Sequence, residues 1–149
     1  MSKLSWGKPT IEIAPITNGT IGTYIKLPTP VEESTQLTTD EGDRQEARTE
    51  GGDLVDVRRG KNSYSCVFEL FKTKGATKPI EDIDGVITQE YSLRLTPADP
   101  TNDGWLMPRA SVSIQDTWSA NDGYKWQYTF EALLPDDGKM LQEYKAPIV

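Results

Sequence analysis

The stretch Tyr124-Lys125-Trp126-Gln127-Tyr128-Thr129-Phe130-Glu131-Ala132 decides the fold class of this 149-residue chain. Every second side chain, starting at Tyr124, is aromatic or apolar, and the side chains between them are polar. A period of two places alternate residues on opposite faces of a β-strand. Aromatic side chains also suit the pleated surface of a sheet. The stretch therefore predicts a strand with one buried face.

The same alternation predicts further strands along the chain. It is clear at residues 64–71, 90–96 and 110–118, and Asn121-Asp122-Gly123 supplies a hairpin turn before residue 124. Three short strands with turns at Gly42-Asp43 and Gly51-Gly52 are expected to form a polar meander. The weaker patterns lie at residues 10–16, 22–27, 37–41, 44–49 and 54–58, with a short apolar element at 140–144.

One short helix is expected between Pro79 and Gly85, because proline favours the first turn of a helix and glycine its end. Many short strands with at most one helix predict an all-β fold, an antiparallel β-sandwich or partial barrel. A chain of 149 residues fits a single domain, residues 1–149. An extended loop is expected at residues 28–36.

The charge and the apolar content exclude several classes of partner. The chain has 23 acidic and 16 basic residues, and its net charge is -7. Such a surface disfavours binding to phosphate backbones and to anionic membranes. No apolar stretch approaches the roughly 20 residues that span a bilayer. The first residues lack the apolar core of a signal peptide, so we expect a protein that stays in the cytoplasm in which it is made.

No catalytic, metal or cofactor site is predicted. The chain has no histidine and one cysteine, Cys66, which falls on the inward face of a predicted strand. These facts argue against Ser-His-Asp, Cys-His and zinc chemistry, although no pair of carboxylates can be nominated or dismissed. The stretch from Asp99 to Gly104 resembles the start of a calcium loop, but Ala110 stands where that loop needs a glutamate. We therefore expect a non-enzymatic protein without cofactors.

Four tryptophans leave a sugar-binding alternative open, because indole rings stack on sugars. Trp126 belongs to the buried face by its position in the alternation, whereas Trp6, Trp105 and Trp118 lie near strand ends or loops. Core packing or subunit contact is the commoner role of such residues. The alternative to an assembling protein is thus a monomeric carbohydrate- or ligand-binding β-sandwich module.

The order of these elements resembles that of phage tail tube (major tail) proteins, whose fold also occurs in contractile and secretion-system tubes. The resemblance runs over residues 35–145: the strand at 64–71, the element at 79–85, three later strands, and the closing stretch 126–133 before Pro135-Asp136-Asp137-Gly138. A baseplate or tail-terminator protein of similar fold is a related alternative.

The resemblance implies that copies of the chain, commonly six in that family, close into a ring whose inner strands form one β-barrel. Rings would stack through loops or arms, contact other tail proteins, and let DNA pass without binding it. Assembly would occur in the host cytoplasm, before incorporation into the virion tail. The residues implied to line the acidic lumen are Asp40, Glu46 and Glu50; those implied between subunits are Arg44 and Arg48; those implied between rings are Pro28, Pro30, Glu32 and Glu33.

Overall fold

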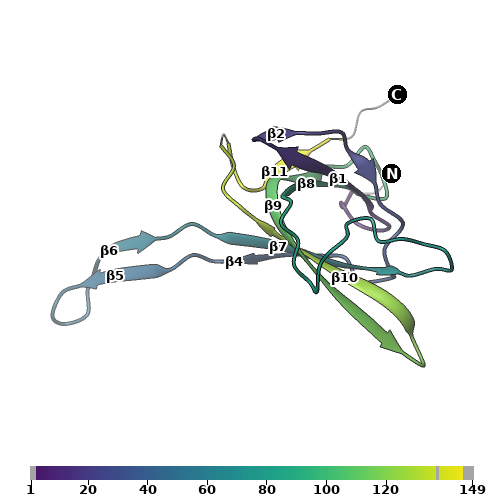
Figure 1. Cartoon of the computed structure of the whole chain (residues 1–149). Coiled ribbons are helices and arrows are strands. Elements are labelled where there is room, and N and C mark those ends of the chain that lie inside the picture. Colours follow the sequence, from purple (N-terminus) through teal and green to yellow (C-terminus); the bar gives the residue numbers. More distant parts are fainter. Residues whose placement is uncertain (1–2, 137, 146–149) are drawn as a thin grey trace.

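The computed structural model describes residues 3–136 and 138–145, and this part of the chain consists of strands and loops without a helix. Figure 1 shows a compact body from which a long thin hairpin projects on the left and a shorter one at the lower right. No described segment is a helix that could cross a membrane. The strands are β1 (Thr10–Thr17), β2 (Thr20–Ile21), β3 (Ile25–Lys26), β4 (Gln36–Asp40), β5 (Arg44–Arg48), β6 (Leu54–Arg59), β7 (Ser63–Phe71), β8 (Tyr91–Thr96), β9 (Gly104–Ser119), β10 (Gly123–Ala132) and β11 (Gln142–Tyr144).

One half of the body is a four-stranded antiparallel part of a single nine-stranded sheet, in the order β4-β7-β10-β9. The predicted hairpin joins β9 to β10, and ten residues of each strand face one another. β7 pairs with β10 on one side and with β4 on the other. The alternation found in the sequence becomes two faces: one is buried against the rest of the body, and the other points outward.

The other half of the body contains β1, β8 and the first part of β9, with β11 beside β9 and β2 and β3 beside β1. β9 belongs to both halves, because it pairs with β8 up to Ala110 and with β10 from Ala110 onward. This confirms the predicted all-β, sandwich-like fold. The core between the halves contains Ile11, Ile13, Leu27, Cys66, Phe68, Leu70, Ile80, Leu93, Leu95, Met107, Ala110, Val112, Ile114, Trp126, Tyr128 and Phe130.

The short helix expected between Pro79 and Gly85 is wrong. Ile83 and Val86 exchange two backbone hydrogen bonds of 3.0 Å across a tight turn. Both residues between them, Asp84 and Gly85, have positive φ (51° and 85°), as a two-residue hairpin turn requires. The Asp-Gly pair therefore reverses the chain where the sequence pattern indicated continuation into a helix.

The expected meander is also wrong in its connections, although each of its three strands exists. β5 pairs with β6 and not with β4, so the chain runs outward through β4 and β5 and returns through β6 and β7. Gly42-Asp43 is not a turn: the Gly60 N–H donates to the Asp43 carbonyl (2.7 Å), which continues the ladder. A Cβ on Gly42 would lie 2.4 Å from the Gly60 backbone, so glycine permits this close approach. Only Gly51-Gly52 turns the chain.

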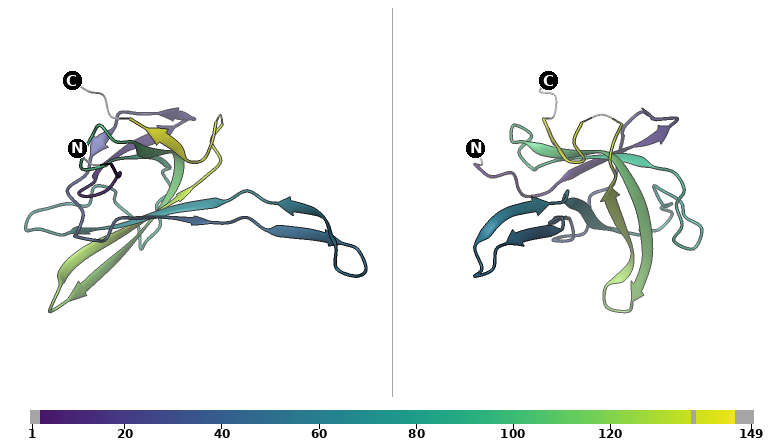
Figure 2. Two further views of the ribbon diagram at one scale, coloured as in Figure 1. Left: turned by 180° about the vertical axis from the view of Figure 1, so that it is seen from behind. Right: turned by 90° about the vertical axis from the view of Figure 1, so that its left-hand side faces the viewer.

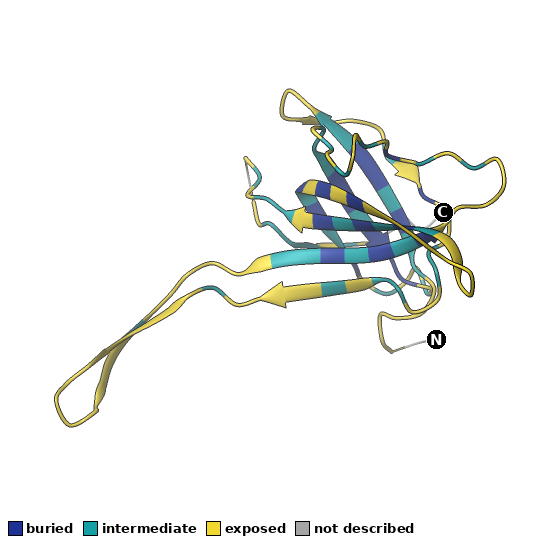
Figure 3. Cartoon of the chain, turned by 60° about the horizontal axis from the view of Figure 1, so that its bottom comes forward, coloured by how far each residue is buried: buried dark blue, intermediate teal, exposed yellow. Residues whose placement is uncertain are grey.

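We call residues 41–62 the arm. It projects from the body in the direction of β4 and β7 (Figures 1 and 2), and nearly all of it is coloured as exposed in Figure 3. Within β5 and β6 only Val57 is partly covered. A two-stranded hairpin without further packing is marginally stable in water. The arm thus lacks the support that the body gives to the other strands.

Candidate assembly surfaces

The outward face of the four-stranded sheet is polar, in rows that the strand register fixes. One row consists of Ser113, Thr129, Val67 and Gln36, and the next consists of Ser111, Glu131, Ser65 and Thr38. Further rows add Gln115, Gln127 and Glu69, then Thr117, Lys125 and Phe71. Most of these side chains are hydroxyls or amides. We call this surface the polar face.

Charge on the polar face is sparse and mainly negative. Lys125 is the one lysine in these rows, and its Nζ lies 3.6 Å from Glu69 Oε2. Asp40 follows Thr38 by two residues and so shares its face, next to the arm. Glu131 is exposed in the row of Ser111. The one lysine of the described rows already has an acidic partner, so a polyanion near this face would meet no unpaired positive charge there.

The four-stranded sheet has two edges that no strand covers in the described part of the chain. β4 pairs with β7 on one side only. β9 has no second paired strand after Ala110, so residues 111–119 pair with β10 alone. The Asp84-Gly85 turn approaches this edge near the Ile114 carbonyl. Unpaired edge strands readily pair with another chain. Because the sheet has four antiparallel strands, its two edge strands run in opposite directions.

One face of the arm is basic. Arg44, Glu46 and Arg48 alternate along β5, and Arg59 and Val57 stand opposite Arg44 and Glu46 on β6. Glu46 pairs with both β5 arginines, at 2.7 Å from the Nε of Arg48. Three arginines and one glutamate thus lie on this face, on a protein whose net charge is -7. We call this surface the basic face of the arm.

The loop before β4 is bound to the body beside the far end of β7. The Val31 N–H donates to the Glu69 carbonyl (2.8 Å), and the Glu69 N–H donates to Ser34 Oγ (3.1 Å). Between this loop and residues 7–9 lies an open pocket of about 460 Å³. Its walls include Pro9, Pro30 and Val31, with two carboxylates, Glu32 and Glu33.

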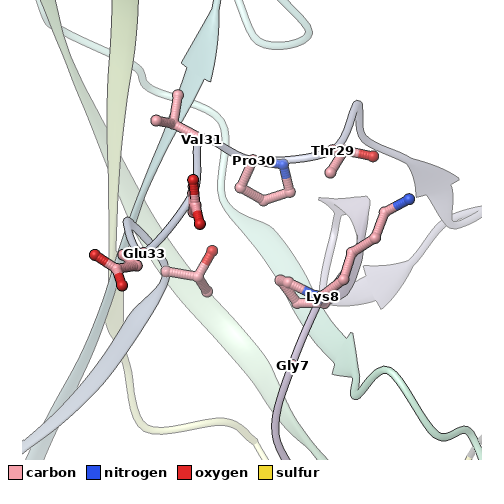
Figure 4. Close-up of a pocket in the computed structure, with 9 residues that line it drawn as sticks. Gly7, Lys8, Thr29, Pro30, Val31 and Glu33 are labelled. Atoms are coloured by element: carbon pink, nitrogen blue, oxygen red, sulfur yellow. The ribbon is translucent and has the colours of Figure 1, made fainter.

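Figure 4 shows the side chain of Lys8, the basic residue of this pocket, extending toward Thr29 and away from Glu33. The acidic side of the pocket is therefore not neutralised by its own lysine. We call this hollow the Glu32–Glu33 pocket. It lies at the Glu69 end of β7, whereas the arm leaves the sheet at Ser63, the opposite end of the same strand.

The structure separates the residues that were expected to act together. Asp40 is on the polar face, but Glu46 and Glu50 are on the arm, outside the four-stranded sheet. Arg44 and Arg48 form the basic face of the arm. The loop residues Pro28, Pro30, Glu32 and Glu33 lie beside the body, and the arm is the segment that projects. The register adds Glu69 and Glu131 to the polar face; their polar positions in alternating strands were the available signal.

Cys66 and three of the tryptophans fall where the sequence indicated, whereas Trp105, at the start of β9, is partly buried against the core. Cys66 is fully buried, and burial raises the pKa of its thiol to about 12. A protonated, buried thiol is a poor nucleophile. Trp126 is in the core, while Trp6 and Trp118 are about two-thirds exposed. Trp118 faces Tyr124 across the β9–β10 hairpin.

The Asp99–Gly104 segment is a turn in which the Asp99 carboxylate accepts hydrogen bonds from the backbone N–H (3.0 Å) and the hydroxyl (2.7 Å) of Thr101. This carboxylate therefore stabilises its own turn.

No protein-family model and no curated protein sequence matches the chain. Its structure is similar to a chain in the cryo-EM structure of an extracellular contractile injection system, described as the PVC sheath/tube terminator in the extended state. The two share 14% sequence identity, with a TM-score of 0.60, and the match covers 95% of this chain and 98% of that chain. At this identity the likeness concerns the fold, and it extends over nearly the whole of both chains. The chain therefore has the fold of a protein from a contractile injection apparatus.

Proposed function

We propose that this protein is a structural, non-catalytic subunit that assembles with copies of itself into rings, and that stacked rings form the tube of a phage tail or a related injection apparatus. One observation carries the proposal: a four-stranded sheet with a polar outward face and two edges that no strand of the described residues pairs with. A sheet in a monomer normally protects its edges, because open edges aggregate.

Ring closure gives both edges a partner. In a cyclic assembly each copy has the same orientation, so β4 of one copy meets residues 111–119 of the next. These edges run in opposite directions, and the joint is therefore antiparallel, like every other pair in the sheet. The polar faces of all copies then form one continuous inner surface, while the apolar face of each sheet stays against its own body.

The chemistry of the polar face suits a channel for DNA. Hydroxyl and amide groups stay hydrated, and the lysine of this face already has a carboxylate partner. A duplex would not be held by clustered cations, and repulsion from the few carboxylates is screened within about 8 Å at physiological salt. Asp40, Glu69 and Glu131 are the residues that we assign to the channel wall.

The fold similarity supports an apparatus of this kind but does not distinguish a tube subunit from another ring of the same apparatus. Electron microscopy of the concentrated protein provides the test. Rings or hollow tubes with a channel are expected, and a protein that remains monomeric at millimolar concentration contradicts the proposal. Single rings that never stack, even with the arm intact, would instead indicate a terminator or baseplate role.

The channel wall has its own test. Glu131→Lys places a cation on the polar face, and we expect tubes of this variant to retain DNA at low salt. Asp56→Lys makes the same charge change on the arm and serves as the matched control, which should retain no more DNA than the wild type. Equal retention of DNA by both variants would show that the polar face does not line the channel.

A further inference from the structure

The arm and the Glu32–Glu33 pocket have complementary charge. The arm presents three arginines with one glutamate, together with the aliphatic side chain of Val57. The pocket presents two glutamates between apolar walls formed by Pro9, Pro30 and Val31. Arginine is suited to such a site, because its guanidinium binds carboxylates in a bidentate manner and packs on apolar surfaces.

The two surfaces lie at opposite ends of the same strand. The arm leaves the sheet at Ser63, and the pocket lies beside Glu69, six residues or roughly 20 Å along β7. The arm also continues the direction of β4 and β7 outward from the body (Figures 1 and 2). Within one copy the basic face therefore cannot reach the pocket.

A second copy displaced along the strands can supply the missing partner. Edge pairing in a ring acts across the strands, so a displacement along them leads to the next ring. Head-to-tail contacts of this type do not close on themselves and build an open stack. Contact with a partner would also provide the packing that an isolated hairpin lacks.

We propose that the basic face of the arm of one copy docks into the Glu32–Glu33 pocket of a second copy in the adjacent ring. Arg44, Arg48 and Arg59 meet the two carboxylates, and Val57 contacts the apolar walls. The inference rests on the proposed ring assembly, and it specifies which two surfaces join the rings.

Charge reversal in both partners tests this contact. Arg44→Glu with Arg48→Glu on the arm, or Glu32→Lys with Glu33→Lys in the pocket, should each raise the protein concentration required for stacking at least tenfold while rings still form. The four substitutions together restore opposite charges and should recover stacking. Arg58→Glu alters the other face of the arm and is the matched control, expected to stack as the wild type does.

Cross-linking tests the contact without requiring rings. A Val57→Cys copy is mixed with a Val31→Cys copy under oxidising conditions; Val57 lies on the basic face of the arm, and Val31 lines the pocket. Each copy has only one new thiol, so a disulfide between them must join different molecules. We expect disulfide-linked pairs on a non-reducing gel, and fewer than one-tenth as many when the arm partner also carries Arg44→Glu and Arg48→Glu.

The outcomes separate this inference from the proposed function. If the copies cross-link but form no rings, the contact is supported and ring assembly is refuted. Rings that stack normally despite charge reversal, without cross-links, would refute the contact and leave ring assembly standing. Loss of stacking through the arm variant but not through the pocket variant would overturn the pocket as the docking site.

Discussion

A proline in β4 tests the proposed joint between subunits most directly. Thr38 and Thr39 are adjacent in this strand, and both are exposed. Along an antiparallel strand, successive backbone N–H groups point to opposite sides. One of the two therefore faces β7 in the same copy, and the other faces the open edge. Proline removes the N–H group at its own position, so Thr38→Pro and Thr39→Pro remove one donor on each side.

The magnitude follows from one lost hydrogen bond. A backbone hydrogen bond contributes about 0.5–1.5 kcal/mol net, and leaving its acceptor buried and unpaired costs about 1–3 kcal/mol. A loss of about 1–3 kcal/mol at each joint corresponds to a roughly 5- to 150-fold weaker contact, since 1.4 kcal/mol is a factor of ten. We therefore expect the variant that alters the open edge to need at least about fivefold more protein for half-maximal ring formation.

Sedimentation velocity over a concentration series measures ring formation, and thermal melting of the dilute protein measures the stability of the subunit. One proline variant should lose rings with an unchanged melting temperature, and the other should melt at a lower temperature because it breaks a β4–β7 bond. Thr38→Val keeps the N–H group and the branched shape and should assemble normally. If both proline variants assemble at the wild-type concentration, β4 does not form the joint.

Three further predictions concern the body. Tyr128→Phe removes the hydroxyl that donates to the Ile80 carbonyl at 3.2 Å in the core. Urea titration should show that the free energy of unfolding falls by about 1–3 kcal/mol, because a buried acceptor is left unpaired. A change of less than about 0.3 kcal/mol would contradict this contact. The hydrogen bond from Lys78 lowers the pKa of Asp82, so the ionised carboxylate stabilises the fold above its unfolded pKa of 3.8. This stabilisation is lost as the pH falls through the lower pKa of the folded protein. Asp82→Asn should therefore flatten the decrease in melting temperature below about pH 4, and an unchanged pH profile would refute the role of Asp82. Cys66 should resist maleimide in the native protein and react fully in guanidinium, and rapid native labelling would place it outside the core.

The sequence predicted the strands that have one buried and one exposed face. β10 alternates without interruption from Tyr124 to Ala132, and its observed register follows this pattern. The first part of β9 escaped prediction because Trp105, Leu106 and Met107 are consecutive apolar residues followed by Pro108, which hides any period of two. That part is paired on both sides, with β8 and β11, so alternation is not required of it.

The arm and the polar face depend on pairing between distant residues, which a local pattern does not contain. Gly42-Asp43 has the composition of a turn, but Gly60 pairs with it from 17 residues away and keeps the chain straight. Glu69 and Glu131 could not be assigned to one surface before the register of β7 and β10 was known. The same reasoning applies to Pro79–Gly85, where the Asp84-Gly85 turn overrides a helix-like composition.

The uneven distribution of apolar residues is a physical argument for assembly. Hydrophobic residues make up 36% of the chain, and those in the core lie on β1, β7, β8, β9 and β10 or in the loops between them. The arm contributes no side chain to this core, although ordering each of its residues costs about 1–2 kcal/mol of conformational entropy. Two strands exposed on both faces do not recover that cost within the monomer. Because the arm presents a basic face on an acidic protein, we propose that another copy makes the compensating contact through its Glu32–Glu33 pocket, which has the opposite charge. In the proposed assembly, an arm ordered only on contact would let rings close first through β4 and β9 and stack afterwards.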